Sequence, residues 1–272
     1  MDPRRSARCA FWHLLAAIAV AAAFARPTSA ADDPLARARQ LYNQRQFEAA
    51  VSAAEEARLI PARADEADLV AARAYLERFR DSEAPDDLTK ARDRLRRLDP
   101  QRLSPLQRTE YIVGLGETLY FDGEFGAAAD VFESVLHGSD LISGEARERV
   151  VDWWASAIDH DAKPRPDMDR QAIYQQARSR LAQELASHPG SSAAAYWLAA
   201  AARAQGDLQS AWETVESGWV RATLLSDHGV GLRADLDRLM TRIIIPERAK
   251  VSAVPPEVLQ QQWEQFKMRW TR

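Results

Sequence analysis

The sequence predicts an all-α protein: an α-solenoid of about five helix-turn-helix pairs, with a helical segment that caps its C-terminal end. Three observations predict this fold. Apolar and small residues recur at helical spacing through most of the chain, turn residues interrupt them at the middle of each pair, and the paired pattern repeats at long intervals. A generic helical bundle whose alanines imitate the pattern is the alternative.

The clearest pair spans residues 111–136. Two stretches with apolar residues at helical spacing are separated by Asp122-Gly123, which predicts two helices joined by a tight turn. Gly123 suits the left-handed conformation that often follows a helix end. Gly116 and Ala128 are small, so we expect the two helices to cross closely at these positions.

This segment resembles a tetratricopeptide repeat, whose first helix carries Leu-Gly and a large residue, and whose second helix carries alanine and an aromatic residue four positions later. Gly116, Ala128 and Phe132 match that pattern, whereas Ile112 and Leu119 stand where the family usually has tryptophan and tyrosine. The resemblance implies a superhelix in which the first helix of each pair lines a concave groove that binds a protein or peptide.

The same pattern recurs in four other places. The residue predicted to open each second helix recurs at intervals of 41, 37, 49 and 34 residues, along the series Phe47, Leu88, Phe125, Tyr174 and Leu208. Each interval equals the family's period of about 34 residues or exceeds it by a loop insertion. The predicted pairs are 34–60, 69–98, 111–136, 147–186 and 196–218.

Residues 1–30 read as an export signal. Basic residues precede an apolar run at 9–25, and the small residues Thr28-Ser29-Ala30 follow it, which predicts cleavage near Ala30 and a periplasmic or secreted protein. An uncleaved membrane anchor is the alternative, because seventeen residues is a short membrane span. Arginine outnumbers lysine 32 to 4, a composition typical of GC-rich bacteria.

Without that segment the chain loses four arginines and one aspartate, which leaves 32 basic and 39 acidic residues. Its acidic balance gives no general attraction for nucleic acid, and we expect no membrane contact beyond the signal segment. The only cysteine, Cys9, leaves with the signal, so the mature chain can form no disulfide.

No catalytic constellation is recognisable, and we expect neither enzymatic activity nor a cofactor. The histidines of the mature chain are scattered at loop-like sites. Asp159-His160-Asp161 with Asp167 and Asp169 is the one metal-like cluster. It lacks the spacing of a calcium loop and the paired histidines of a zinc helix, so we expect no metal there.

The resemblance implies groove positions beside the buried positions of each first helix. Exposed aromatic side chains beside arginines would suit a peptide, although the aromatic residues could instead fill the core. Trp153 is expected to be buried and its neighbour to face the groove. The candidate groove residues are Arg39, Tyr42, Asn43, Arg73, Leu76, Val113, Glu117, Tyr120, Phe121, Trp154, Tyr196 and Arg203.

The predicted organisation is a signal at 1–30, a repeat domain at 31–225 and a helical cap at 226–272. The final helix opens at Pro255-Pro256 and carries one apolar stripe, formed by Leu259, Trp263, Phe266 and Trp270. The stripe either covers the last face of the solenoid or docks on a partner or a second copy of the chain.

The sequence therefore favours an exported, non-enzymatic scaffold that binds a protein or peptide in its concave groove. One alternative is an envelope assembly or maintenance component that oligomerises through its C-terminal aromatic helix. A second is a glycan-binding protein, because aromatic side chains in a groove also stack on sugars.

Overall fold

The computed structural model describes residues 33–138, 141–142, 144–225, 227 and 229–271, and every regular element within them is a helix. The expected export signal lies outside this part of the chain. None of the described helices combines the length and hydropathy that crossing a membrane requires. The elements are α2 (Pro34–Asn43), α3 (Phe47–Arg58), η2 (Pro61–Arg63), α4 (Ala64–Ser82), α5 (Pro85–Arg97), η3 (Pro100–Arg102), α6 (Pro105–Phe121), α7 (Phe125–Gly138), α8 (Gly144–Ala162), α9 (Asp167–Ser187), α10 (Ser192–Ala204), α11 (Leu208–Arg221), η4 (Ala222–Leu224), α12 (Val230–Leu239), the π-helical turn η5 (Met240–Ile244), α13 (Ile245–Ser252) and α14 (Pro256–Trp270).

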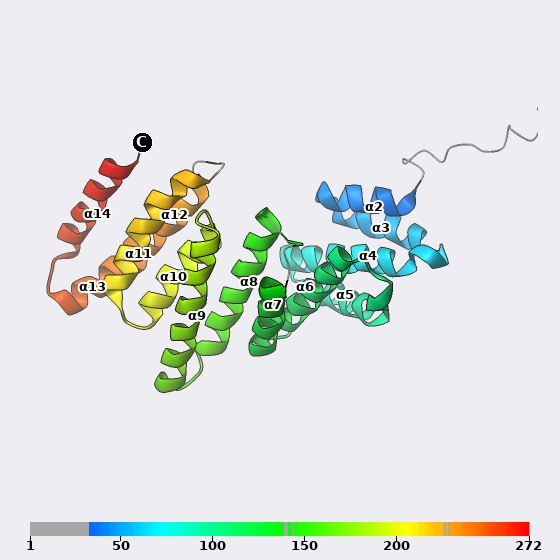
Figure 1. Cartoon of the computed structure of the whole chain (residues 1–272), viewed down its shortest axis with the longest axis horizontal. Helices are drawn as coiled ribbons and strands as arrows, with labels where there is room; N and C mark the ends of the chain where they lie inside the picture. The colour runs from blue at the N-terminus through cyan, green and yellow to red at the C-terminus, as the bar shows by residue number, and fades with distance from the viewer. Residues whose placement is uncertain (1–32, 139–140, 143, 226, 228, 272) are drawn as a thin grey trace, which may run out of the picture.

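The helices follow one another in chain order along the long axis of the molecule and pack as antiparallel pairs (Figure 1). The first helix of each pair also contacts the first helix of the next: α2 contacts α4, α4 contacts α6, α6 contacts α8, α8 contacts α10, and α10 contacts α12. The first helices therefore form one continuous layer. The predicted all-α class and the sequential pairing of helices are confirmed.

Most of the predicted helix starts agree with the structure. α3, α7 and α11 begin at the residues that the sequence predicts to open them. α5 and α9 begin earlier, at three residues before Leu88 and seven before Tyr174. Pro85 is the first residue of α5 and Pro166 immediately precedes α9. Proline at such a position favours a helix start, because its fixed φ fits the first turn and its missing N–H is not needed there.

Three turns between paired helices have the same backbone geometry. In each, one residue adopts a left-handed conformation, with φ of 60° at Arg45, 83° at Gly123 and 77° at Gly206. That residue donates its N–H to the carbonyl three positions earlier, and the next residue donates to the carbonyl five positions earlier. This pair of bonds satisfies carbonyl groups that the helix end leaves open.

The close crossing predicted at Gly116 is present between α6 and α7. A Cβ atom added to Gly116 would lie 2.6 Å from Cε1 of Phe132, which is fully buried. Ala128 is also fully buried on the facing helix. The absence of a side chain at Gly116 is therefore what lets Phe132 fill the space between the two helices.

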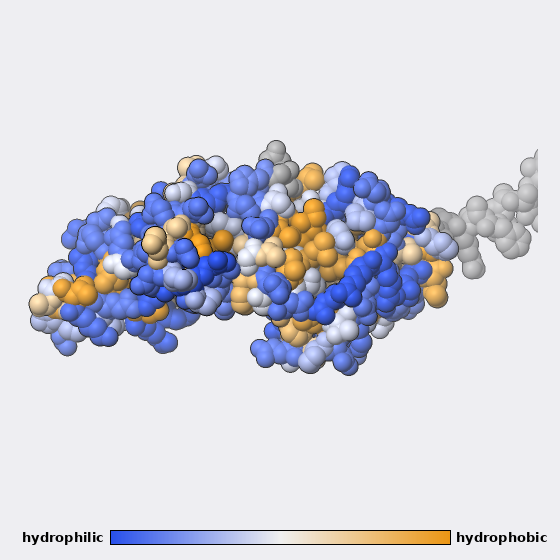
Figure 2. Space-filling model, turned by 90° about the horizontal axis from the view of Figure 1, so that it is seen from below, coloured by the Kyte–Doolittle hydropathy of each residue, from blue (hydrophilic) through white to orange (hydrophobic). Residues whose placement is uncertain are grey.

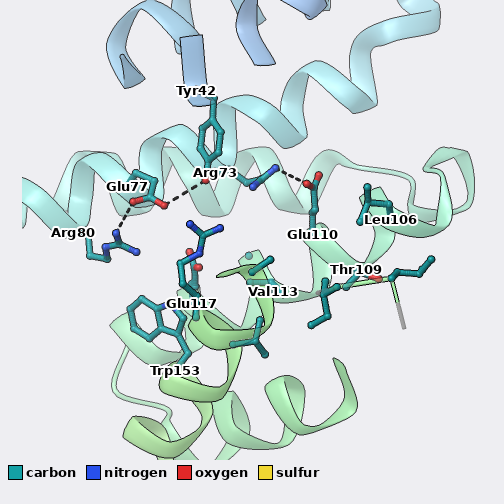
Figure 3. A pocket seen from close by; sticks show the side chains of 16 residues that line it. Tyr42, Arg73, Glu77, Arg80, Leu106, Thr109, Glu110, Val113, Glu117 and Trp153 are labelled. Carbon is teal, nitrogen blue, oxygen red and sulfur yellow. Dashed lines mark hydrogen bonds and ion pairs between the residues drawn. The ribbon is translucent and has the colours of Figure 1, made fainter. Parts of the chain in front are cut away.

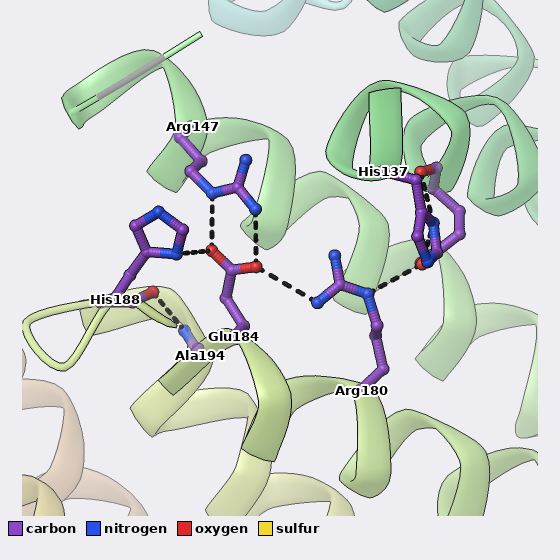
Figure 4. A network of polar contacts seen from close by, with 8 residues as sticks. His137, Arg147, Arg180, Glu184, His188 and Ala194 are labelled. Atoms are coloured by element: carbon purple, nitrogen blue, oxygen red, sulfur yellow. Dashed lines mark hydrogen bonds and ion pairs between the residues drawn. The ribbon is translucent and has the colours of Figure 1, made fainter. Parts of the chain in front are cut away.

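A buried carboxylate ties α8 to α9 (Figure 4). Glu184 of α9 is 3% exposed and accepts two hydrogen bonds from Arg147 of α8, at 2.7 and 2.8 Å. Arg180 and His188 approach the same carboxylate at 3.2 and 2.9 Å. Burial acts to raise the pKa of Glu184, but the bonds from Arg147 and the surrounding charges outweigh burial and lower it. The chain itself supplies the partners of this carboxylate, so its role is structural.

The last helix packs on its own chain. α14 contacts α11 and α13. Trp263 is fully buried with its ring centre 5.1 Å from that of Trp219, and Phe266 stacks on it at 5.6 Å. Leu259 is buried, whereas Trp270 at the other end of the stripe is 47% exposed. The first part of the predicted stripe therefore covers the preceding helices, and only its end reaches the surface.

Candidate functional site

Two adjoining hollows lie on the layer of first helices, between α2, α4, α6 and α8. Their volumes are about 210 Å³ and about 140 Å³, and they share Tyr42, Arg73 and Glu110. We call them together the central groove. Figure 3 shows the larger hollow, and Figure 2 shows apolar residues gathered near the middle of the molecule. The groove is lined by Arg39, Tyr42, Asn43, Glu66, Leu69, Val70, Arg73, Glu77, Arg80, Leu106, Gln107, Thr109, Glu110, Val113, Gly114, Glu117, Leu141, Ile142, Ala146, Arg149, Val150 and Trp153.

Arg73 of α4 connects two sides of the groove. Its guanidinium carbon lies 4.4 Å from the ring centre of Tyr42 on α2, and its Nη1 pairs with Glu110 on α6 at 2.8 Å. The Tyr42 hydroxyl donates to Glu77 at 3.4 Å, and Arg80 pairs with the same carboxylate at 2.7 Å. These contacts join three first helices and restrain the polar side chains of the groove wall.

The surroundings of Tyr42 and Arg73 determine the charge of these two side chains. Burial raises the pKa of Tyr42, and the neighbouring Arg73 opposes that shift only in part. Burial acts to lower the pKa of Arg73, but the Tyr42, Glu110 and Glu117 side chains together outweigh burial and the pKa is raised. At neutral pH the groove therefore presents a neutral phenol beside a charged guanidinium.

Glu117 of α6 differs from the other carboxylates of the groove. It is partly buried, and no hydrogen bond or ion pair from the described residues reaches its carboxylate. Burial raises its pKa to about 7, with the Glu77 carboxylate adding to the shift and three arginines opposing it. Because the ordinary value is 4.5, the stability linked to this group is complete below pH 4.5 and is lost as the pH rises through about 7.

The structure corrects the expected placement of two adjacent tryptophans. Trp154, predicted to face the groove, is 5% exposed in the core, and Trp153, predicted to be buried, lines the groove. Successive helix residues point about 100° apart, so only one of the two can face the groove. Val150 and Val151, four and three positions before Trp154, are buried on the same side of the helix. Their apolar spacing is the signal in the sequence that could have placed Trp154 in the core.

Three other candidate groove residues pack between helices instead of lining the groove. Leu76 is 1% exposed. Tyr120 is partly buried and its hydroxyl shares a 2.8 Å hydrogen bond with Ser156 of α8. The ring of Phe121 meets that of Phe79 at 4.8 Å between centres. Their large side chains fill the space between neighbouring helix pairs, so they do not reach the groove.

The remaining candidates divide between two places. Tyr196 and Arg203 line a separate C-terminal hollow of about 500 Å³, built from α8, α9, α10 and the segment from α12 to α13. Arg203 is paired there with Glu247 at 2.9 Å. The central groove collects the other six candidates, which are Arg39, Tyr42, Asn43, Arg73, Val113 and Glu117.

The sequence reasoning missed several charged residues of the groove. Glu77 and Arg80 lie four and seven positions after Arg73, and Glu110 lies three positions before Val113. Each is therefore on the same helical face as a predicted groove residue, and extending that face by a turn would have found it. Ile142 comes from the segment between α7 and α8, where no helical period could place it.

The acidic cluster near the end of α8 has other partners. Asp159 and Asp161 form ion pairs with basic residues four positions later, at 2.6 and 2.8 Å. His160 stacks on Phe125 with ring centres 4.6 Å apart. Across the described residues, no group of three or more histidine, cysteine, aspartate or glutamate side chains is arranged to hold a metal ion.

Comparison with known proteins adds no family to this geometry. No protein-family model matches the chain, and no curated protein matches it either. The assignment of a function therefore depends on the residues of the groove.

Proposed function

We propose that this chain is an exported, non-enzymatic scaffold: an α-solenoid of tetratricopeptide-like helix pairs that binds a protein or peptide in its central groove. The observation that carries the proposal is the groove itself, which runs across α2, α4, α6 and α8 and combines apolar walls with restrained polar side chains. Such a surface suits an extended segment, whose side chains and backbone groups need both kinds of contact.

Two features support the repeat architecture. The turns at Arg45, Gly123 and Gly206 share one hydrogen-bond pattern. Three positions after the start of α3, α7 and α11, the residue is a fully buried alanine, at Ala50, Ala128 and Ala211 respectively. Recurrence of one turn and one small contact residue is what stacked copies of a single hairpin unit would contain.

The binding proposal can be tested with a random peptide library displayed on phage and panned against the purified protein. Selected peptides are then measured against a Val113→Trp variant, whose indole would fill the groove, and against Ser134→Trp on the exposed surface of α7. We expect Val113→Trp to weaken binding at least about tenfold and Ser134→Trp to leave it unchanged. Peptides that bind both variants like the parent protein would show that the groove is not the binding site.

Export is tested separately. Mass spectrometry of the protein recovered from outside the cytoplasm should show an N-terminus near Ala31. An intact N-terminus in the membrane fraction would instead favour the uncleaved anchor.

The alternative of assembly through the final helix has less support. Leu259 and Trp263 are buried against the chain's own helices, so they are not free to join two copies. Met268 and Trp270 of the same helix are 74% and 47% exposed, but they lie outside its buried contact with the chain.

A further inference from the structure

The charged side chains of the larger hollow are unequally partnered. Arg73 pairs with Glu110 at 2.8 Å, and Arg80 pairs with Glu77 at 2.7 Å. The Glu117 carboxylate has no hydrogen-bond or ion-pair partner among the described residues, although it lies in the same hollow. It is therefore the acidic group of the groove that is left to interact with a ligand.

The apolar surroundings of Glu117 make the lack of an ion-pair partner unfavourable for its charged form. Apolar side chains of α6, α8 and the segment before α8 share the hollow with it, including Val113, Ile142, Val150 and Trp153. A carboxylate that is withdrawn from water without a partner destabilises the folded state, and either protonation or a cation relieves the cost. Burial and the Glu77 carboxylate raise the pKa of Glu117 to about 7, although Arg80, Arg73 and Arg149 act in the opposite direction.

We infer that the central groove holds a basic side chain of the bound segment, lysine or arginine, with its cation paired to Glu117 and its aliphatic stem against the apolar wall. Basic side chains combine these two parts, because they bury their methylene stem while keeping the charged end near a polar group. The inference rests on the proposed function, since it names the side chain that a bound peptide would place in the hollow.

An acidic ligand fits the hollow less well. Arg73 and Arg80 already have carboxylate partners within the groove. Arg149 faces the hollow too, and its ion pair with Glu145 is exposed and long, at 3.5 Å. An anion attracted by Arg149 would also meet the unpaired negative charge of Glu117, and like charges in a partly buried site repel strongly.

Binding of a basic side chain should depend on pH. The charged and titratable groups that face Glu117 are Tyr42 from α2, Arg73, Glu77 and Arg80 from α4, Glu110 from α6 itself and Arg149 from α8. Raised pKa values keep Tyr42 neutral and Arg73 charged between pH 6 and 8. With a pKa of about 7, Glu117 is about tenfold more ionised at pH 8 than at pH 6, so affinity should rise about tenfold over that range.

The test uses the full protein with labelled isoleucine methyl groups, followed by nuclear magnetic resonance. Ile142 lines the hollow of Glu117, and Ile243 lines the C-terminal hollow as an internal control. The probes are Nα-acetyl-lysine amide, its uncharged analogue Nα-acetyl-norleucine amide, and Nα-acetyl-glutamate amide. We expect the lysine probe alone to shift Ile142 in a saturable manner, more tightly at pH 8 than at pH 6, while Ile243 stays unchanged.

Two variants assign the effect to the carboxylate. Glu117→Gln should weaken the lysine probe at least about tenfold, whereas Glu247→Gln, which alters a paired carboxylate of the C-terminal hollow, should not change its affinity. Glu117→Asp, which keeps the charge, should retain part of the binding. Unliganded methyl spectra that match the parent protein confirm that each variant is folded.

The inference is overturned if Glu117→Gln binds the lysine probe like the parent protein, or if the norleucine or glutamate probe shifts Ile142 equally well. The same variant separates the two proposals. Peptides that Val113→Trp rejects but Glu117→Gln still binds would leave the groove as the binding site and remove the basic side chain. Peptides that bind Val113→Trp as tightly as the parent protein would contradict the proposed function, even if the lysine probe binds at Glu117.

Discussion

The helices α2–α5 and the helices α8–α14 are packed with side chains of very different size. Ten of the eighteen buried apolar residues within α2–α5 are alanine. The core of α8–α14 buries four tryptophans: Trp154, Trp212, Trp219 and Trp263. The two groups of helices also run in different directions in Figure 1, nearly along the long axis in the first region and steeply across it in the second.

This difference changes what each region depends on. An alanine core lets helix backbones approach closely but buries little apolar surface per residue, so many small contacts must act together. The first region adds ion pairs between helices, such as Asp68 with Arg94 at 2.6 Å and Asp87 with Arg78 at 3.1 Å. A tryptophan core concentrates the buried surface in a few side chains. We therefore expect the first region to be sensitive to added volume and the second to lost volume.

The largest expected effect is the loss of a tryptophan from the second region. Trp263 is fully buried, stacks edge-on against Trp219 and donates its indole N–H to Asp237 at 2.8 Å. Trp263→Ala should destabilise the protein by about 3 to 5 kcal/mol, because it leaves a cavity and removes the hydrogen bond. Denaturant unfolding measures the loss, and hydrogen exchange should show that α14 opens first.

Trp270→Ala is the control, because it removes the same side chain from the exposed end of the same helix. Its cost should be below about 1 kcal/mol. Equal costs for the two substitutions would mean that α14 does not depend on the buried contact with α11.

The next effect, smaller, is overpacking of the first region. Ala50 and Ala49 are neighbours on α3, and Ala50 is fully buried while Ala49 is exposed. Ala50→Leu should cost about 1 to 3 kcal/mol, because the added carbons would push α3 away from its neighbours, whereas Ala49→Leu should cost less than about 0.5 kcal/mol. Thermal unfolding of both variants checks this, and an Ala50→Leu protein as stable as Ala49→Leu would contradict close packing in the alanine core.

Much of the fold could be predicted because its signals are local. The spacing of apolar residues predicted paired helices, and Gly123 and Gly206 marked two of the three similar turns. Arg45 occupies the third turn with the same geometry, and nothing in its side chain signals a left-handed conformation. The direction in which successive pairs stack depends on contacts between distant residues, so the change of helix direction between the two regions had no signal in the sequence.

The candidate site was predicted less completely than the fold. A helical face predicts that Arg73, Val113 and Glu117 point to one side, but it does not predict which charges will pair after folding. Arg73 forms an ion pair with Glu110 but not with Glu117, on which it acts only through its charge. Trp153 and Trp154 were assigned the wrong way round for a different reason. A shift of one residue in helix register decides which of the two rings is buried.

The smallest predicted effect concerns the turn that the two regions share. Arg45 has φ of 60°, which side-chain-bearing residues adopt at a cost, whereas the equivalent Gly123 and Gly206 adopt it freely. Arg45→Gly should therefore stabilise the protein by about 0.5 to 1 kcal/mol, even though glycine makes the unfolded chain more flexible. Gln44→Gly, one position earlier at a negative φ of −83°, is the control and should destabilise slightly.

A Cβ at Gly123 or Gly206 would meet no atom within 4 Å, so the penalty at this turn comes from backbone conformation alone. The reciprocal Gly123→Arg substitution should consequently cost about as much as Arg45→Gly gains, and unequal changes in denaturant midpoint would show that the two turns are not equivalent.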